Sequence, residues 1–290
     1  MKLNFSKYHG AGNDFVMVDN RTDDRRLWDA LSPEVIAHLC HRHFGIGADG
    51  LIMAIKSGGD TPYTMGYFNA DGSRAEMCGN GLRCLVRFLD DLGEPVRDME
   101  EIRIMTGAGP IASRFNPTDD NLIQVAMPIP RFEPERAKIS VDAEHAIDHQ
   151  VFIPGVEEPV IGTAVGVGNP HFVLFRPDMW DGSEVHDIGY RLGIHEELFP
   201  EGVNVGFARK EGQNHMALVV HERGVGPTLA CGSGAVAAVG AGIATERFEL
   251  EQRVQVRMPG GVLFVTIGSQ WSWALLEGEA VHVFSGEIDV

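Results

Sequence analysis

The sequence predicts an α/β (α+β) protein of two pseudo-symmetric domains, in each of which strands wrap around one central apolar helix. One observation is a near repeat in which Met77-Cys78-Gly79-Asn80-Gly81 returns as Ala230-Cys231-Gly232-Ser233-Gly234. Each copy opens an apolar segment that is typical of a helix. The second observation is that three blocks recur in one order at a nearly constant offset, which indicates a duplicated unit. The other two pairs are Gly12-Asn13-Asp14-Phe15-Val16 with Gly168-Asn169-Pro170-His171-Phe172-Val173, and Thr106-Gly107-Ala108-Gly109 with Met258-Pro259-Gly260-Gly261.

The elements of the first half follow from turn signals and apolar periodicity. Residues 5–19 predict two strands joined by a tight glycine turn, and residues 33–44 predict a helix with Ser32 as its N-cap, ending near Gly45. Residues 45–50 are glycine-rich but precede a strand, at 51–55, and so do not form a phosphate-binding loop. A strand at 63–69 and a turn at 70–73 lead to Cys78.

The helix after Cys78 carries an apolar stripe at Leu82, Leu85, Val86 and Leu89, which leaves Arg83, Arg87 and Asp90 turned away from the core. Residues 102–106 and 111–115 predict a hairpin. A proline-rich, charged stretch at 128–136 marks a crossing between domains. The helix at 235–244 is small and apolar all round, as expected of a helix buried on every side. Residues 280–288 predict a final strand that can return to the first domain.

Composition and charge narrow the class of protein. The chain has 290 residues, 44% of them hydrophobic, which is enough for a large core. No apolar run approaches the roughly 18–20 residues of a membrane span, and the polar start does not resemble a signal peptide, so we expect a cytoplasmic protein. The net charge of −17 makes nucleic acid and membrane surfaces unsuitable partners. An anionic ligand would therefore need a local positive site, such as a helix N-terminus.

Four cysteines, at positions 40, 78, 84 and 231, match no zinc-binding spacing. Cys40 and Cys84 lie within apolar patterns and are interpreted as small buried side chains. Cys78 and Cys231 are different, because each stands among glycines at a helix start, where the helix dipole favours a thiolate or a bound carboxylate. We expect no cofactor and no metal.

The paired cysteines indicate a chemistry. If the duplicated halves face each other, one thiolate can remove a proton from one face of a carbon while the other thiol delivers a proton to the opposite face. The result is inversion of a stereocentre beside a carboxylate, whose developing charge the two helix N-termini would stabilise. Arg223 could bind a ligand carboxylate as a bidentate fork or form an ordinary ion pair, and the sequence alone leaves both open.

The ordered set of motifs resembles the diaminopimelate epimerases, cofactor-independent isomerases of lysine and cell-wall biosynthesis, over nearly the whole chain. The motifs that carry the resemblance are His9-Gly10-Ala11-Gly12-Asn13-Asp14-Phe15, Arg42-His43-Phe44-Gly45-Ile46-Gly47-Ala48-Asp49, Phe68-Asn69-Ala70-Asp71-Gly72-Ser73, Met77-Cys78-Gly79-Asn80-Gly81-Leu82-Arg83-Cys84, Gly168-Asn169-Pro170-His171, Gly202-Val203-Asn204, and Glu222-Arg223-Gly224 through Ala230-Cys231-Gly232-Ser233-Gly234. The resemblance implies that family's fold, with barrel-like mixed or antiparallel sheets. Its first domain would comprise residues 1–127 plus 277–290 and its second residues 128–276.

The resemblance also implies residue roles. Cys231 would be the base and Cys78 the acid for the LL-to-meso direction, with His171 and Glu222 beside the thiols to tune them. The expected partner is a small diamino-diacid, and a homodimer stays open. The substrate would be bound by Asn13, Asn69, Gly79, Asn80, Asn169, Asn204, Glu222, Arg223, Gly232 and Ser233.

Two positions depart from the pattern of many members of that family. Gly50 stands where a glutamine is common, and Pro227-Thr228 stands where Glu-Thr is common. Two other functions stay open. One is a racemase or epimerase of the proline or hydroxyproline type, although that group typically has histidine where Asn80 stands. The other is a binding protein that keeps the fold without the chemistry.

Overall fold

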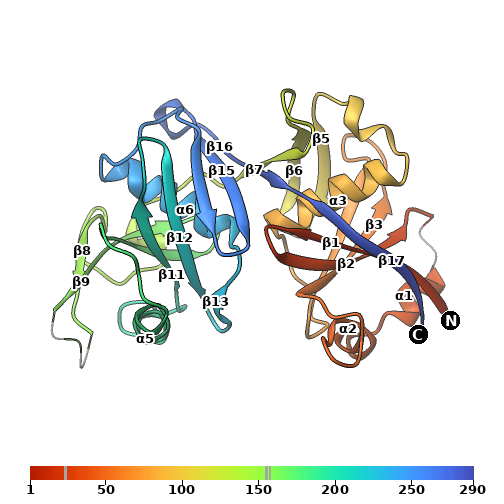
Figure 1. Cartoon of the computed structure of the whole chain (residues 1–290), viewed down its shortest axis with the longest axis horizontal. Coiled ribbons are helices and arrows are strands. Elements are labelled where there is room, and N and C mark those ends of the chain that lie inside the picture. The colour runs from red at the N-terminus through yellow and green to blue at the C-terminus, as the bar shows by residue number, and fades with distance from the viewer. Residues whose placement is uncertain (23–24, 154–155, 157) are drawn as a thin grey trace. The chain divides into compact units, whose positions relative to one another are not determined.

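The computed structural model describes residues 1–22, 25–153, 156 and 158–290. Backbone contacts divide the chain into two compact units, Met1–Ala126 with Glu277–Val290, and Met127–Leu276. Each unit is built mainly of strands, with few helices (Figure 1). The predicted α/β class is therefore confirmed.

The first unit contains a sheet with the strand order β17-β1-β2-β3-β4-β5-β6-β7. Its elements are β1 (Lys2–Gly10), β2 (Asn13–Asn20), α1 (Arg25–Ala30), α2 (Pro33–Cys40), β3 (Gly50–Lys56), β4 (Tyr63–Asn69), α3 (Gly79–Asp91), η1 (Pro95–Asp98), β5 (Ile102–Thr106), β6 (Gly109–Phe115), β7 (Leu122–Met127) and β17 (Val281–Asp289). Ala11 and Gly12, between β1 and β2, both have positive φ, as a two-residue hairpin turn of type I′ requires.

The second unit repeats this organisation. Its elements are α4 (Pro134–Ala137), β8 (His149–Val151), β9 (Val160–Gly166), β10 (Pro170–Phe175), α5 (Gly182–Gly193), β11 (Asn204–Lys210), β12 (His215–Glu222), β13 (Gly226–Thr228), α6 (Gly232–Ala244), β14 (Val254–Met258), β15 (Gly261–Ile267), η2 (Ser269–Trp271) and β16 (Ala274–Glu279). The last three residues of β16 belong to the first unit.

Strand pairing confirms the duplication that the sequence predicts. Along β1 to β6 the successive pairs are antiparallel, parallel, antiparallel, parallel and antiparallel. The same alternation runs through β9, β10, β11, β12, β14 and β15. Helix α3 follows β4, which ends at Asn69, and α6 follows β12, which ends at Glu222. Each cysteine therefore stands at the same place in its unit.

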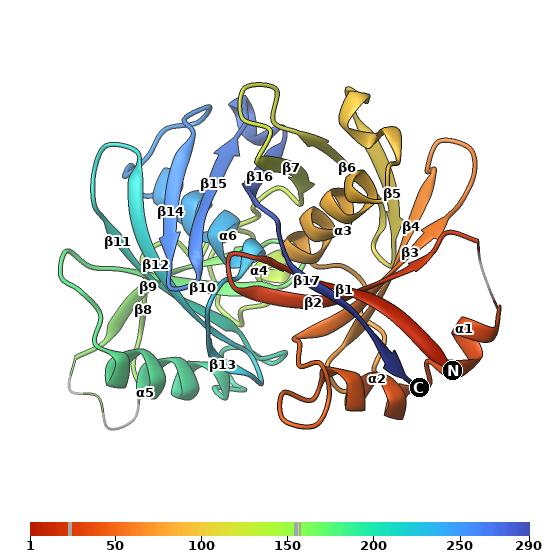
Figure 2. The ribbon, with the colours of Figure 1, turned by 45° about the vertical axis from the view of Figure 1, so that its right-hand side comes forward.

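The two helices that follow the cysteines are the buried centres of their units. Helix α6 packs on β9, β10, β11, β12 and β15, and its residues from Gly234 to Gly242 are buried, as predicted from their small apolar side chains. Helix α3 packs on β1, β2, β3, β6 and β17 (Figure 2). The prediction that Arg83 turns away from this core is wrong, because its side chain is completely buried.

The predicted helix at 33–44 begins as expected but ends earlier. The Ser32 hydroxyl accepts a hydrogen bond from the backbone N–H of Val35, and α2 stops at Cys40. His41 is in an extended conformation, and the N–H groups of Ile46 and Gly47 both donate to the Leu39 carbonyl. These bonds fold residues 42–47 back over the helix end, so the last carbonyls are satisfied without a further helical turn.

The predicted final strand is present as β17, which pairs antiparallel with β1 along nearly its whole length. The two termini lie side by side, and the Val290 N–H donates to the Met1 carbonyl at 2.8 Å (Figure 1). In the described part of the chain, no helix combines the length and the apolar character that crossing a membrane demands.

Candidate active site

Cys78 is the N-cap of α3, in an extended backbone conformation with φ −140° and ψ 120°. Its carbonyl accepts the first intrahelical bond, from Leu82 N–H at 2.8 Å. The N–H groups of Gly79, Asn80 and Gly81 precede that bond and so have no acceptor within the helix. They lie at the positive end of the helix dipole, next to the thiol, and can bind an anion there.

Three predicted residues of the first unit meet at this helix start. The Cys78 Sγ lies 3.6 Å from Asn13 Oδ1, and Asn80 Nδ2 donates to the same oxygen at 3.3 Å. Asn13 Nδ2 in turn donates to Asp49 Oδ2 at 2.8 Å. Because an amide oxygen can only accept, Cys78 is the donor in this contact and carries its proton.

A cluster of charged side chains holds the start of β2 next to Asn13. Asp14 accepts from Lys7 Nζ at 2.7 Å and from Arg42 at 2.8 Å, and Arg42 also reaches Asp49 at 2.7 Å. Burial alone raises the pKa of Asp14, but the hydrogen bonds and charges of Arg42 and Lys7 outweigh it and lower this pKa to about 2. These ion pairs fix β2 at the point where Asn13 begins it.

Cys231 caps α6 in the same way but with different partners. Its Sγ accepts from the Gly234 N–H at 3.4 Å and lies 3.6 Å from the Ser233 hydroxyl. Only 6% of the residue is exposed. A sulfur that accepts a backbone N–H at a helix N-terminus is in surroundings that favour the thiolate.

His171 lies in β10 and connects two other predicted residues. Its Nε2 is 3.0 Å from Asn169 Oδ1 and 3.1 Å from Ser233 Oγ. Burial, with a smaller effect of the Arg223 charge, lowers the pKa of His171 to about 3, so the imidazole is neutral at pH 7. Since the Asn169 oxygen can only accept, the Nε2–H tautomer fits these contacts. The single Nε2–H is then shared between the Asn169 oxygen and the Ser233 hydroxyl, which leaves the hydroxyl hydrogen available to Cys231 Sγ.

The remaining predicted residues of the second unit lie at the start of β11 and at the end of β12. Asn204 stands opposite His171 in the β10–β11 register, and its side chain accepts from the Arg223 backbone N–H at 2.9 Å while donating to the Pro170 carbonyl at 3.1 Å. Arg223 is exposed, and its guanidinium donates to the Glu201 carbonyl. Within the described ranges of the chain, no carboxylate forms an ion pair with Arg223. Glu222 accepts from the Thr228 hydroxyl at 2.6 Å.

Of the predicted binding residues of the first unit, Asn69 is directed elsewhere. At the end of β4 its amide donates to the Ser73 hydroxyl at 3.0 Å, within the turn before Cys78. Gly79 and Gly232 occupy the first positions of α3 and α6, as the motif requires. One neighbour of Cys78 lies outside the predicted set. Buried Arg83 donates from Nη2 to Asn80 Oδ1 at 2.9 Å, and the i, i+3 spacing of two polar residues on one helix is the sequence signal for it.

The other two cysteines are buried and neutral. Cys40 is 3% and Cys84 0% exposed, as predicted for small apolar side chains. Burial raises the pKa of Cys40 to about 11 and that of Cys84 to about 12. None of the four cysteines is in a disulfide.

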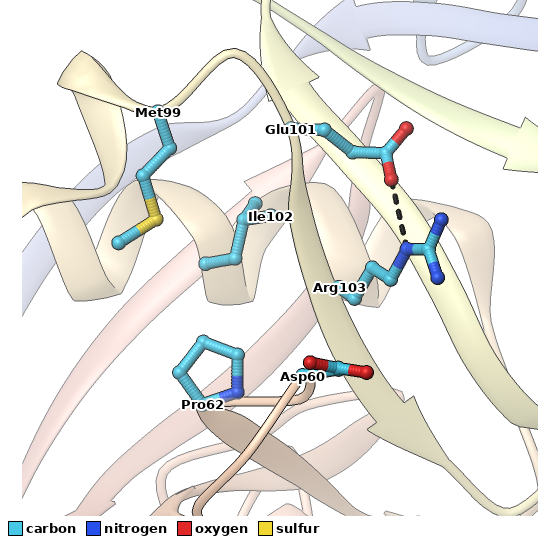
Figure 3. A pocket seen from close by; sticks show the side chains of 6 residues that line it. All are labelled: Asp60, Pro62, Met99, Glu101, Ile102 and Arg103. Atoms are coloured by element: carbon cyan, nitrogen blue, oxygen red, sulfur yellow. Dashed lines mark hydrogen bonds and ion pairs between the residues drawn. The ribbon is translucent and has the colours of Figure 1, made fainter.

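Two further features of the described residues are unrelated to this chemistry. No group of three or more His, Cys, Asp or Glu side chains among them is arranged to hold a metal ion. A hollow of about 320 Å³, lined by Asp60, Pro62, Met99, Glu101, Ile102 and Arg103, contains no predicted site residue (Figure 3). Its one cation, Arg103, is paired with Glu101 at 2.9 Å.

Solved structures similar to this chain share its fold. They include a phenazine biosynthesis protein of the PhzF family from Bacillus anthracis, with a TM-score of 0.66, 17% identity and full coverage of both chains. A hydroxyproline epimerase from Agrobacterium vitis has a TM-score of 0.66 at 12% identity, covering 99% of this chain and 92% of its own. Duplicated units of mixed strands, each with a cysteine at the start of its central helix, define the class of fold that this chain shares with them.

Sequence relatives identify the family. The family described as diaminopimelate epimerase matches residues 5–132 and 163–283. The diaminopimelate epimerase of Synechocystis sp. (strain ATCC 27184 / PCC 6803 / Kazusa) is 40% identical and is covered in full, as is this chain. That of Synechococcus sp. (strain JA-3-3Ab) is 40% identical over 98% of each chain. The chain belongs to the diaminopimelate epimerase family.

Proposed function

We propose that this protein interconverts LL- and meso-diaminopimelate by proton transfer at an α-carbon between two cysteine thiols, without a cofactor. The observation that carries the proposal is that a cysteine-capped helix with a Gly-polar-Gly first turn is built twice, once in each unit. The activity would serve lysine and peptidoglycan-precursor biosynthesis in the cytoplasm. The two units would be the family's two domains.

The contacts of the two thiols support different starting states. Cys231 accepts an N–H from its own helix and has the Ser233 hydroxyl nearby, so it is suited to be the thiolate that removes the α-proton of the LL isomer. Cys78 donates to Asn13 and is suited to be the thiol that delivers a proton. In the reverse direction the two exchange roles, as microscopic reversibility demands.

Charge develops on the substrate carboxylate when the α-proton leaves. Backbone N–H groups at the starts of α3 and α6, around Gly79-Asn80 and Gly232-Ser233, are the donors that we assign to this carboxylate. They are held in place by the helices and need no reorganisation during the reaction. Because the protein as a whole is strongly acidic, these local positive ends are also what would attract an anionic substrate.

The distal end of the substrate would be bound through Arg223. Its backbone is held by Asn204, its guanidinium is exposed, and it can offer a planar fork to a carboxylate. Asn69, Asn169 and Glu222 complete the proposed binding set for the amino and carboxylate groups.

The test is an assay of the purified full chain with LL-diaminopimelate, L-proline and trans-4-hydroxy-L-proline, followed by chiral separation of the products. We expect only diaminopimelate to be epimerised, unaffected by a chelator or a carbonyl-trapping reagent and abolished by iodoacetamide. Cys40→Ala should be alkylated and inactivated like the wild type, because Cys40 is a buried thiol at the end of α2 and caps neither α3 nor α6. Turnover of an imino acid alone, or activity lost to the chelator and restored by a metal, would refute the proposal.

A further inference from the structure

Arg83 is the largest side chain that the fold buries completely, and it carries a charge. Burial lowers the pKa of Arg83, but a guanidinium remains protonated under all conditions in which a protein is folded. An ion removed from water costs several kcal/mol unless it is paired, so a buried arginine usually faces a carboxylate. Arg83 does not.

The hydrogen bonds of Arg83 go to neutral groups. Its Nη2 donates to Asn80 Oδ1 at 2.9 Å and its Nε to the Glu279 carbonyl at 3.5 Å. Its Nη1 is buried and has no hydrogen-bond partner in the described part of the chain. The groups whose negative charge acts on Arg83 are the thiols of Cys84 and Cys78.

Several charged and titratable groups on the surrounding elements have partners of their own, and one is exposed. Lys7, Asp14, Arg42 and Asp49 form the ion cluster below Asn13, Tyr8 donates to Asp91, His9 accepts from the Gly12 N–H, and the Glu279 side chain is exposed. Cys84 is completely buried, and its high pKa keeps it protonated. Of the two thiols that act on Arg83, only Cys78 is at the helix start where an anion can form.

The contacts connect Arg83 to Cys78 through two amides. Arg83 holds the Asn80 oxygen, which turns the Asn80 amide nitrogen toward Asn13 Oδ1, and that oxygen accepts from the Cys78 thiol. Gly10 leaves room for this arrangement, since a Cβ there would lie 2.9 Å from Arg83 Nη2 and 3.3 Å from the Asn80 carbonyl oxygen. The guanidinium is thus fixed behind the first turn of α3.

We propose that Arg83 is the positioning residue and buried counter-charge of Cys78. It orients Asn80 and Asn13 on the thiol and stabilises the thiolate that remains after Cys78 has delivered its proton. In that step the S–H bond breaks, the C–H bond of the product forms, and the negative charge moves from the substrate to the sulfur. The inference deepens the proposed function and rests on it for the identity of the reaction.

The test compares Arg83→Met and Arg83→Lys with Arg87→Met, a matched arginine one turn further along α3 that pairs with Asp90 and contacts Phe115. The first measurement is alkylation of Cys78 by iodoacetamide from pH 6 to 10, without substrate, resolved from the other cysteines by peptide mass spectrometry. For Arg83→Met we expect the pH midpoint of Cys78 alkylation to rise by about one unit, because a nearby positive charge favours the ionised form of an acidic group. Arg87→Met should keep the wild-type profile.

The second measurement is kcat and KM for both directions. Arg83→Met should lower kcat about 10- to 100-fold with little change in KM, because the lost interaction acts on the proton-transfer step. In Arg83→Lys the pH profile of Cys78 alkylation should stay close to that of the wild type, because an ammonium keeps the positive charge. Its kcat should still fall, because the ammonium lacks the planar donors that hold Asn80. If Arg83→Met does not fold, Arg83→Lys decides the question alone, and an unchanged kcat in it would overturn the positioning role.

Wild-type alkylation and kcat in a folded Arg83→Met protein would overturn the inference altogether. If the proposed function is wrong, the epimerisation and alkylation measurements give a different combination of results. In that case the wild type would not epimerise diaminopimelate, while the alkylation midpoint of Cys78 would still shift in Arg83→Met.

Discussion

At the scale of single residues, His171 is the side chain that we propose to tune Cys231 without titrating itself. With its pKa lowered to about 3 by burial, it stays neutral across the physiological range. In our proposal its effect on Cys231 passes through the contact with the Ser233 hydroxyl, which lies 3.6 Å from the sulfur. The equivalent position in the first unit is Phe15, a buried apolar side chain, so the surroundings of the two thiols differ.

The low pKa of His171 predicts a pH dependence of stability. The neutral form is favoured in the folded state, so the unfolded chain binds more protons between about pH 3 and 6.5, and stability falls as the pH decreases through that window. Between pH 7 and 5 the loss from this one group is about 2 kcal/mol. In His171→Gln that loss should be absent, so the gap in unfolding free energy between wild type and variant should narrow by about this amount.

Urea unfolding at pH 7 and pH 5 measures the difference in unfolding free energy between wild type and His171→Gln directly. His145→Gln is the matched control, because His145 is exposed and its variant should track the wild type at both pH values. A gap between wild type and His171→Gln that stays constant from pH 7 to 5 would show that the buried imidazole does not resist protonation.

At the scale of elements, Gly50 stands at a close approach between two strands. It begins β3, at the place that Asn204 takes in β11 of the other unit. A Cβ at position 50 would lie 2.5 Å from the Phe68 carbonyl oxygen and 3.0 Å from the Tyr67 ring. The β3–β4 pair is therefore closed too tightly at this point for a residue with a side chain.

This close approach predicts that Gly50→Ala destabilises the fold by about 1–3 kcal/mol, as overpacking against backbone usually does. Gly50→Gln should cost at least as much. Gly58→Ala, in the loop after β3 with nothing within 4 Å of its Cβ position, should be nearly neutral. Urea midpoints at equal m-values give the comparison, and a Gly50→Ala midpoint equal to that of Gly58→Ala would mean that the two strands separate easily.

How much of the fold the sequence predicts depends on whether the signal is local. The hairpin turn at Gly12, the cap at Ser32 and the starts of α3 and α6 are fixed by neighbouring residues, and these predictions are confirmed. The end of α2 is not local, because it is set by hydrogen bonds from residues 46 and 47 back to Leu39. Helix α5 lies outside the predicted elements.

For the functional site, too, the sequence predicts what neighbouring residues determine and misses what depends on tertiary packing. Repetition of the cysteine motif locates both helix starts, and the contacts of Asn13 with Cys78 and of His171 with Ser233 join residues that the motifs named separately. Arg83 escapes such reasoning because helical periodicity assigns a charged residue to the solvent side. Only the three-dimensional packing reveals that Gly10 leaves space for its guanidinium.

At the scale of the whole molecule, the duplication is nearly symmetrical in backbone but not in chemistry. Both units pair their strands in the same order and place a cysteine at the same helix start. Their side chains differ, since Cys78 is contacted by Asn13 while Cys231 has Ser233, which is held by His171. Under the proposed mechanism, such a pair of similar but inequivalent acid–base groups would act on the two stereoisomers of one carbon.

The two-thiol mechanism requires a thiol from each unit, and isotope labelling tests this directly. If one cysteine removes the α-proton and the other delivers a proton that has equilibrated with solvent, early product formed in deuterium oxide should carry deuterium at the inverted carbon. The remaining substrate should carry little. A single base that exchanges its proton with solvent would instead put deuterium into both the product and the remaining substrate.

Cys78→Ala should abolish inversion but allow exchange into the LL isomer, because Cys231 still acts on that face. Cys231→Ala should show the converse, with exchange only into the meso isomer. Serine should rescue neither, since its hydroxyl is far too weak an acid to form the equivalent anion near neutral pH. Chiral chromatography with mass detection resolves all four pools, and inversion at more than half the wild-type rate in either alanine variant would exclude the paired-cysteine mechanism.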